Sequence, residues 1–130
     1  MIVLDASAVV DWLLQTAAGR QVENRIYSRH ESLHAPHLLD VEVAQVLRRL
    51  ARQGVISTRR AEEALHDLMD LRVNRYTHAV FLPRIWQLRQ NLSAYDAAYV
   101  VLAEQLGATL LTRDARLASA AGHTASVEVV

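Results

Sequence analysis

Ile-Val-Leu-Asp-Ala-Ser, residues 2–7, is the stretch of sequence that decides the fold. Its three apolar residues predict a short buried strand that ends at Asp5. From Ala6 to Gln15 the apolar residues follow helical spacing, so a helix begins directly after the acid. A strand followed at once by a helix is typical of α/β proteins, which carry functional groups where their strands end. Asp5 and Ser7 are therefore candidate site residues, with capping of this helix as the alternative role for each.

The same arrangement returns near the end of the chain. Residues 108–112 predict a second strand, and Asp114 follows it just before a helix that begins at Ala115. If the two strands are neighbours, Asp5 and Asp114 point into one crevice, where like charges need protons or a metal ion to relieve their repulsion. Helix capping remains the alternative for each acid taken singly.

Strands and helices alternate between these two stretches. The clearest helix covers 38–53, with Gly54 as its stop, and a second helix follows the capping residue Ser57. The other expected elements are helices over 19–29, 79–90 and 94–106 and strands over 32–35, 71–76 and 127–130. Pro83 must lie in the first turn of its helix or kink it. We therefore expect one domain over residues 1–130, an α/β protein with a parallel sheet and helices on both faces.

Composition excludes several kinds of chemistry. The 130 residues carry no net charge and no Cys, so thiolate zinc sites and a cysteine nucleophile are excluded. All 14 basic residues are Arg, which removes chemistry that depends on Lys. The opening residues do not resemble a signal peptide, and no apolar run is long enough to cross a bilayer. These features predict a cytoplasmic protein without a membrane partner.

Asp96 is the acid whose surroundings are the most telling. It lies in the first turns of a helix that is apolar almost all round, and at about 100° per residue it falls between Val100 and Ala103. A carboxylate there is costly unless a helix amino terminus, a hydrogen bond or a cation balances it. A functional site explains Asp96 better than a favourable dipole alone does.

Two acids in the 38–53 helix cannot be separated in this way. Glu42 lies about 80° from the centre of the apolar stripe, and Asp40 lies similarly far to the other side. Each is also an ordinary dipole partner for the helix start. The residues alone leave the choice between them open.

These stretches together resemble the PIN-domain ribonucleases, most closely the VapC toxins of bacterial toxin–antitoxin pairs. The resemblance spans nearly the whole chain, and its carriers are the opening IVLDAS, Glu42, the stretch LSAYDAAY at 92–99, and LLTRD at 110–114. It implies a three-layer sandwich with a short parallel sheet. It also implies a catalytic quartet of Asp5, Glu42, Asp96 and Asp114 and thereby selects Glu42 over Asp40. Ser7 and Thr112 would be hydroxyls that support this quartet.

The resemblance further implies Mg²⁺ or Mn²⁺ as the metal. We expect Asp5, Asp96 and Asp114 to bind it directly or through water, while Glu42 either binds the metal or accepts the proton of the attacking water. An oxygen-only donor set suits such hard cations. Some family members carry another acid where this chain has Arg116, so a fifth acidic ligand is not expected. The implied partners are RNA, a VapB-type antitoxin and a second copy of the chain, in a homodimer and in toxin–antitoxin hetero-oligomers.

Arginines are the expected contacts to the RNA. Arg49 lies within about 20° of Glu42 on the helix and roughly 10 Å along its axis, which suits tracking of a phosphate backbone. Arg113 and Arg116 flank Asp114 and are the other candidates. Each of the three is equally well explained as a solvated surface residue.

Other functions fit these acids less well. A receiver domain also gathers acids at strand ends, but it needs a Lys that this chain lacks. The paired Asp-x-Asp of a phosphatase is missing, because Ser7 follows Asp5 at that spacing. A catalytically inactive PIN domain that binds RNA or protein is the alternative from another class, and the complete quartet argues against it.

Overall fold

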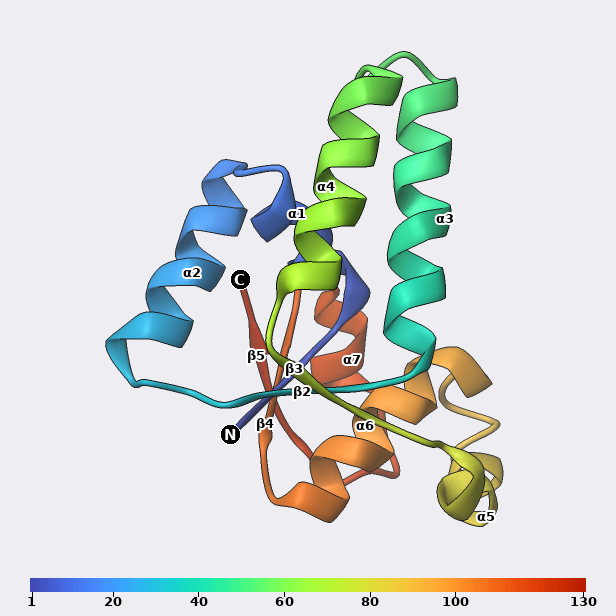
Figure 1. The fold of residues 1–130 in the computed structure, drawn as a ribbon. Coiled ribbons are helices and arrows are strands. Elements are labelled where there is room, and N and C mark those ends of the chain that lie inside the picture. The colour runs from blue at the N-terminus through green and yellow to red at the C-terminus, as the bar shows by residue number, and fades with distance from the viewer.

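Five parallel strands form one sheet in the order β3-β2-β1-β4-β5 (Figure 1). The computed structural model describes residues 1–130. Its strands are β1 (Ile2–Leu4), β2 (Leu33–Pro36), β3 (Val73–Tyr76), β4 (Thr109–Thr112) and β5 (Ser126–Val129). The predicted first strand lies at the centre of the sheet, and its three residues are fully buried. Such burial is what a parallel strand covered on both faces requires.

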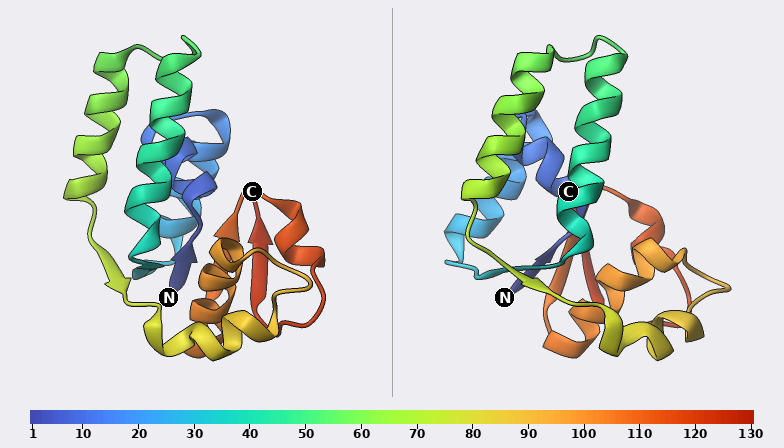
Figure 2. Two further views of the ribbon diagram at one scale, coloured as in Figure 1. Left: turned by 90° about the vertical axis from the view of Figure 1, so that its right-hand side faces the viewer. Right: turned by 45° about the vertical axis from the view of Figure 1, so that its right-hand side comes forward.

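Helices cover both faces of the sheet, which confirms the predicted three-layer α/β architecture. They are α1 (Ala6–Leu13), α2 (Ala17–Ser28), α3 (Leu38–Arg52), α4 (Thr58–Asp70), α5 (Leu82–Gln87), α6 (Ala94–Leu106) and α7 (Ala115–Ser119), with a 3₁₀ turn, η1, at Ala79–Phe81. Helix α6 packs across β1, β2 and β4. Helices α3 and α4 form a hairpin that extends beyond the sheet (Figure 2). None of these helices combines the length and the apolar character needed to span a membrane.

The order of the strands places a topological switch point between β1 and β4. From β1 the chain moves outward through β2 to β3, and it then returns to the opposite side of β1 to form β4. The direction of winding therefore reverses between β1 and β4. In open parallel sheets, ligands bind at such a switch point, outside the carboxyl ends of the strands. Asp5 and Asp114 follow these two strands.

The element boundaries differ from the sequence expectation mainly around Pro83. One helix was expected over 79–90, but the chain forms the 3₁₀ turn η1 and then the shorter helix α5. Pro83 occupies the first turn of α5, where its missing N–H costs nothing, so it causes no kink. Gly107 ends α6 as predicted, in the left-handed conformation with a φ of 61°.

Glu104 joins α5, α6 and the loop before β5. Its carboxylate accepts hydrogen bonds from Arg84 Nη2 at 2.9 Å and from the Thr124 N–H at 2.9 Å, and the side chain is only 7% exposed. The hydrogen bond from Arg84 is the main reason that the pKa of Glu104 falls to about 2. The ionised carboxylate is therefore strongly favoured in the folded state.

Replacing Glu104 with glutamine is expected to lower the free energy of unfolding by about 2–3 kcal/mol at pH 7. Because the folded pKa is depressed, this contribution is present above the unfolded pKa of about 4.5 and is lost as the pH falls toward 2. Urea unfolding of both proteins between pH 7 and pH 3 checks this, with Glu63→Gln on α4 as an exposed control. A Glu104→Gln effect that stays constant below pH 4.5 would contradict the account.

Candidate active site

Asp5 lies at the centre of the candidate site and is 7% exposed. Its Oδ2 accepts hydrogen bonds from Ser7 Oγ at 2.6 Å and Thr112 Oγ1 at 2.7 Å, while its Oδ1 accepts none within the chain. Asp5 precedes α1, but its side chain makes no capping hydrogen bond to that helix. The capping alternative therefore does not apply to Asp5, and one of its oxygens remains free for another partner.

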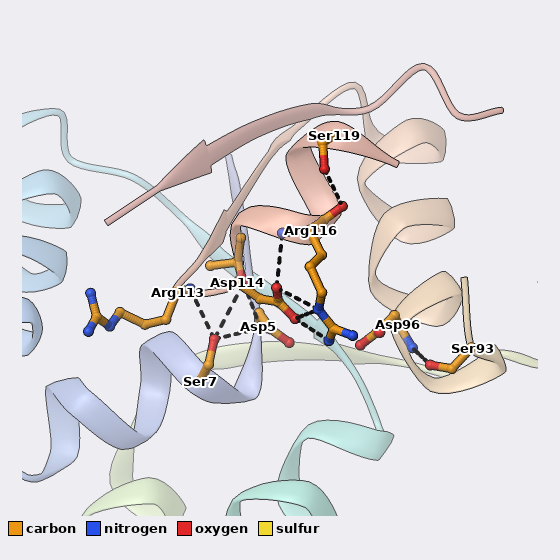
Figure 3. Close-up of polar contacts among 9 residues, drawn as sticks. Asp5, Ser7, Ser93, Asp96, Arg113, Asp114, Arg116 and Ser119 are labelled. Atoms are coloured by element: carbon orange, nitrogen blue, oxygen red, sulfur yellow. Dashed lines mark hydrogen bonds and ion pairs between the residues drawn. The ribbon is translucent and has the colours of Figure 1, made fainter. Parts of the chain in front are cut away.

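The two hydroxyls also fix the loop that carries Asp114. Ser7 Oγ accepts a hydrogen bond from the Arg113 N–H and Thr112 Oγ1 accepts one from the Asp114 N–H, both at 3.0 Å. Each hydroxyl thus donates to Asp5 and accepts from the backbone after β4, as Figure 3 shows for Ser7. This double role holds the ends of the neighbouring strands β1 and β4 in one arrangement.

Glu42, on the second turn of α3, is the least satisfied acid. Its Oε1 is buried and has no hydrogen-bond partner. Burial is the main reason that the pKa of Glu42 is raised, and the charge of Asp5 raises it further. Asp40, which the sequence could not separate from Glu42, is instead paired with Arg75 of β3 at 2.8 Å. Of these two acids on α3, only Glu42 lacks a counter-ion.

Asp96 shares this environment from the opposite face of the sheet. Ser93 caps α6 by accepting the Asp96 N–H at 3.1 Å, which places the carboxylate in the first turn of the helix. Burial is the main reason that its pKa is raised, and Asp5 again adds to the effect. Asp5 therefore acts electrostatically on both Glu42 and Asp96, so the three acids lie within reach of one another's charge.

Asp114 is the one member of the quartet that is neutralised within the chain. Its side chain caps α7 by accepting the Arg116 N–H at 3.0 Å, so the capping role applies here. The Arg116 guanidinium also forms an ion pair with the carboxylate. Hydrogen bonding from this side chain is the main reason that the pKa of Asp114 is lowered. Figure 3 shows the guanidinium between Asp114 and Asp96.

The other two candidate arginines lie apart from this cluster. Arg113 donates to Asp11 at 2.9 Å and to the main-chain oxygen of Val130 at 2.6 Å, so its guanidinium is already engaged. Arg49 is exposed on α3 and makes no ion pair. Of the three arginines, Arg49 alone has a guanidinium without a partner in the protein.

Tyr99 is a site neighbour that the sequence analysis did not identify. It is fully buried on α6, and its hydroxyl, like Glu42 Oε1, is a buried polar atom without a hydrogen-bond partner. Burial and the charge of Glu42 both raise its pKa, so the phenol stays protonated and faces the carboxylate. Its signal in the sequence is a hydroxyl three residues after Asp96, on the same side of the helix.

The donors suit a divalent cation, although no three His, Asp or Glu side chains are arranged closely enough to hold one as they stand. The orphaned Oε1 of Glu42, the free Oδ1 of Asp5 and the raised pKa values of Glu42 and Asp96 all describe carboxylates that lack a counter-charge. Carboxylate oxygens are the ligands that Mg²⁺ and Mn²⁺ prefer. A cation between these acids would relieve their repulsion, so the residues fit such an ion.

Comparisons with known proteins agree with this architecture. Residues 2–123 match the family model described as the PIN domain. The chain is 42% identical to ribonuclease VapC9 of Mycobacterium tuberculosis over 130 residues, covering 100% of this chain and 98% of that protein.

Two solved structures share the fold. PAE2754 from Pyrobaculum aerophilum has a TM-score of 0.71 at 26% identity, covering 98% of this chain and 83% of that one. VapBC2 from Rickettsia felis, solved with a DNA fragment from its promoter, has a TM-score of 0.65 at 11% identity. This match covers 99% of this chain and 98% of that one. The chain therefore belongs to the PIN-domain family, and within it to the VapC ribonucleases.

Proposed function

We propose that this protein is a divalent-metal-dependent endoribonuclease that acts as the toxin of a toxin–antitoxin pair. The observation that carries the proposal is the meeting of the buried Asp5 with the half-buried Glu42 and Asp96 at the switch point of the sheet, where neither Asp5 nor Glu42 has a counter-ion. Keeping like charges together in this way costs stability, and proteins accept such a cost mainly at functional sites. Full-length similarity to a VapC ribonuclease supports the same activity.

Asp5, Asp96 and Asp114 would hold the metal, Mg²⁺ or Mn²⁺. When bound, the ion supplies an acidified water and neutralises charge that grows on the phosphate. The hydroxyls of Ser7 and Thr112 keep the Asp5 carboxylate in one orientation, so little reorganisation is needed when a ligand arrives. Glu42 serves either as a further ligand or as the base that accepts the proton of the attacking water.

RNA would approach the carboxyl ends of β1 and β4. Arg49 is available to contact phosphates along α3, since its guanidinium has no partner in the protein. Arg113 would first have to leave Asp11, and Arg116 would have to leave Asp114. Among the three predicted RNA contacts, we therefore assign the main contact with the RNA phosphates to Arg49.

A cognate antitoxin is the expected protein partner, as in the VapBC2 structure from Rickettsia felis. The protein has apolar surface to offer: Val80 is 71% exposed and Trp86 is 67% exposed. Leu65 is partly exposed and lines a hollow of about 300 Å³ between α3 and α4, whereas Leu68 belongs to the core. Such surfaces suit both the antitoxin and a second copy of the chain.

The proposal predicts that RNA is cleaved in the presence of Mg²⁺ or Mn²⁺ and that EDTA abolishes the cleavage. The experiment uses purified protein, a mixture of cellular RNAs and metal titrations, with gel analysis of the fragments. Readdition of Mn²⁺ should restore activity, which separates metal loss from unfolding. Cleavage that continues unchanged in EDTA would refute the metal-dependent mechanism, and absence of cleavage under all conditions would favour a binding module.

A further inference from the structure

Arg116 engages both carboxylate oxygens of Asp114. Its Nε lies 3.0 Å from Oδ1 and 3.1 Å from Oδ2, and its Nη2 lies 2.5 Å from Oδ2. The Arg116 N–H also donates to Oδ1 at 3.0 Å, so both oxygens already have strong donors. In this conformation the acid has no oxygen left without a partner, unlike Asp5 and Glu42.

The position of the guanidinium extends its influence beyond Asp114. Figure 3 shows it between Asp114 and Asp96, and its charge acts on both acids. A guanidinium presents a positive charge and several N–H donors, but it cannot acidify water as a metal ion does. The arginine thus supplies part of the positive charge that the acidic cluster lacks.

We infer that Arg116 is a built-in cation that competes with the divalent metal for Asp114 and thereby sets the metal concentration at which the site fills. The inference rests on the proposed function, because it takes the acidic cluster as the metal site. An ion that uses Asp114 as a ligand must first displace the guanidinium. Asp5 and Glu42 have no such competitor within the chain.

The ion pair between Arg116 and Asp114 can dissociate at little cost in free energy. The Arg116 side chain is 81% exposed and that of Asp114 is 27% exposed, so water can replace the broken hydrogen bonds. Exposed pairs of this kind contribute little to stability. The pair therefore shifts the metal affinity without blocking the site. The released guanidinium would remain beside the acidic cluster, because Arg116 lies only two residues after Asp114.

The experiment measures Mn²⁺ binding to the full chain through the electron paramagnetic resonance signal of the free ion, without RNA. Arg116→Gln is expected to bind Mn²⁺ about two- to fivefold more tightly than the parent, which corresponds to at most about 1 kcal/mol. Arg113→Gln is the matched control. It removes the same charge from the residue directly before Asp114, whose guanidinium pairs with Asp11 rather than with Asp114. Arg113→Gln should change the affinity for Mn²⁺ by a smaller factor than Arg116→Gln does.

A second comparison isolates the role of Asp114. In an Asp114→Asn background, Arg116→Gln should raise the Mn²⁺ affinity by a smaller factor than in the parent, because the pair with Asp114 is already broken and only the charge near Asp96 is removed. The inference is overturned if Arg116→Gln and Arg113→Gln change the affinity equally, or if the Arg116→Gln effect is undiminished in the Asp114→Asn background. A parent protein that binds no Mn²⁺ would overturn the proposed metal site as well, so the two failures are distinguishable.

Discussion

Asp5→Asn is expected to lower the rate of RNA cleavage by at least about a hundredfold while leaving the fold intact. Asparagine keeps an oxygen that can accept hydrogen bonds from Ser7 and Thr112, so the local structure has no reason to change. What is lost is the charge that would attract the metal ion. Cleavage assays across a Mg²⁺ titration measure the effect, and circular dichroism checks the fold.

The same substitution should not destabilise the protein. Asp5 raises the pKa of both Glu42 and Asp96, so its negative charge opposes their ionisation. Without it, the folded state loses repulsion, and the melting temperature is expected to stay level or rise. Asp70→Asn, at an exposed acid on α4, is the matched control and should change neither the rate of RNA cleavage nor the melting temperature. Asp5→Asn protein that cleaves RNA as fast as the parent would remove Asp5 from the catalytic site.

Gly19→Ala is expected to reduce the free energy of unfolding by at least about 3 kcal/mol. A Cβ at this position would lie 1.9 Å from the carbonyl oxygen of Asp11 and 2.8 Å from the backbone nitrogen of Trp12. Both contacts are with the backbone of α1, so no side-chain rotation can relieve them. Helix α2 would have to move away from α1, which directly follows Asp5. Urea denaturation of the variant measures the loss.

Gly54→Ala is the matched control for this loss. The added Cβ would meet nothing within 4 Å, but the backbone φ of +72° is unfavourable for alanine, so a cost of about 1 kcal/mol is expected. Comparing the two substitutions separates steric contact from backbone conformation. If Gly19→Ala costs no more than Gly54→Ala, the close approach of α1 and α2 does not limit stability.

The order of elements was predictable because each carries a local signal. Asp5 ends an apolar run and Ser93 precedes an apolar helix, and the structure has the strand and the capped helix where these signals lie. The sequence left open whether β1 and β4 are neighbours, and the sheet shows that they are. Local pattern therefore located the strand ends, and topology brought their acids together.

Long-range contacts explain what the sequence left open. The helical wheel could not separate Glu42 from Asp40, because the decisive partner, Arg75, lies 35 residues further along the chain. Sequence reasoning identified Arg116 only as a candidate RNA contact. Its pairing with Asp114 depends on the direction of a long side chain at a helix start, which spacing alone does not determine.

The location of the metal is the most direct test of the account. Crystals of the protein soaked in Mn²⁺ should give an anomalous scattering peak within about 2.5 Å of a carboxylate oxygen of Asp5, next to Glu42 and Asp96. The same Mn²⁺ solution should support RNA cleavage. An ion bound only elsewhere, in a protein that cleaves RNA under these conditions, would contradict the proposal that these acids form the catalytic centre.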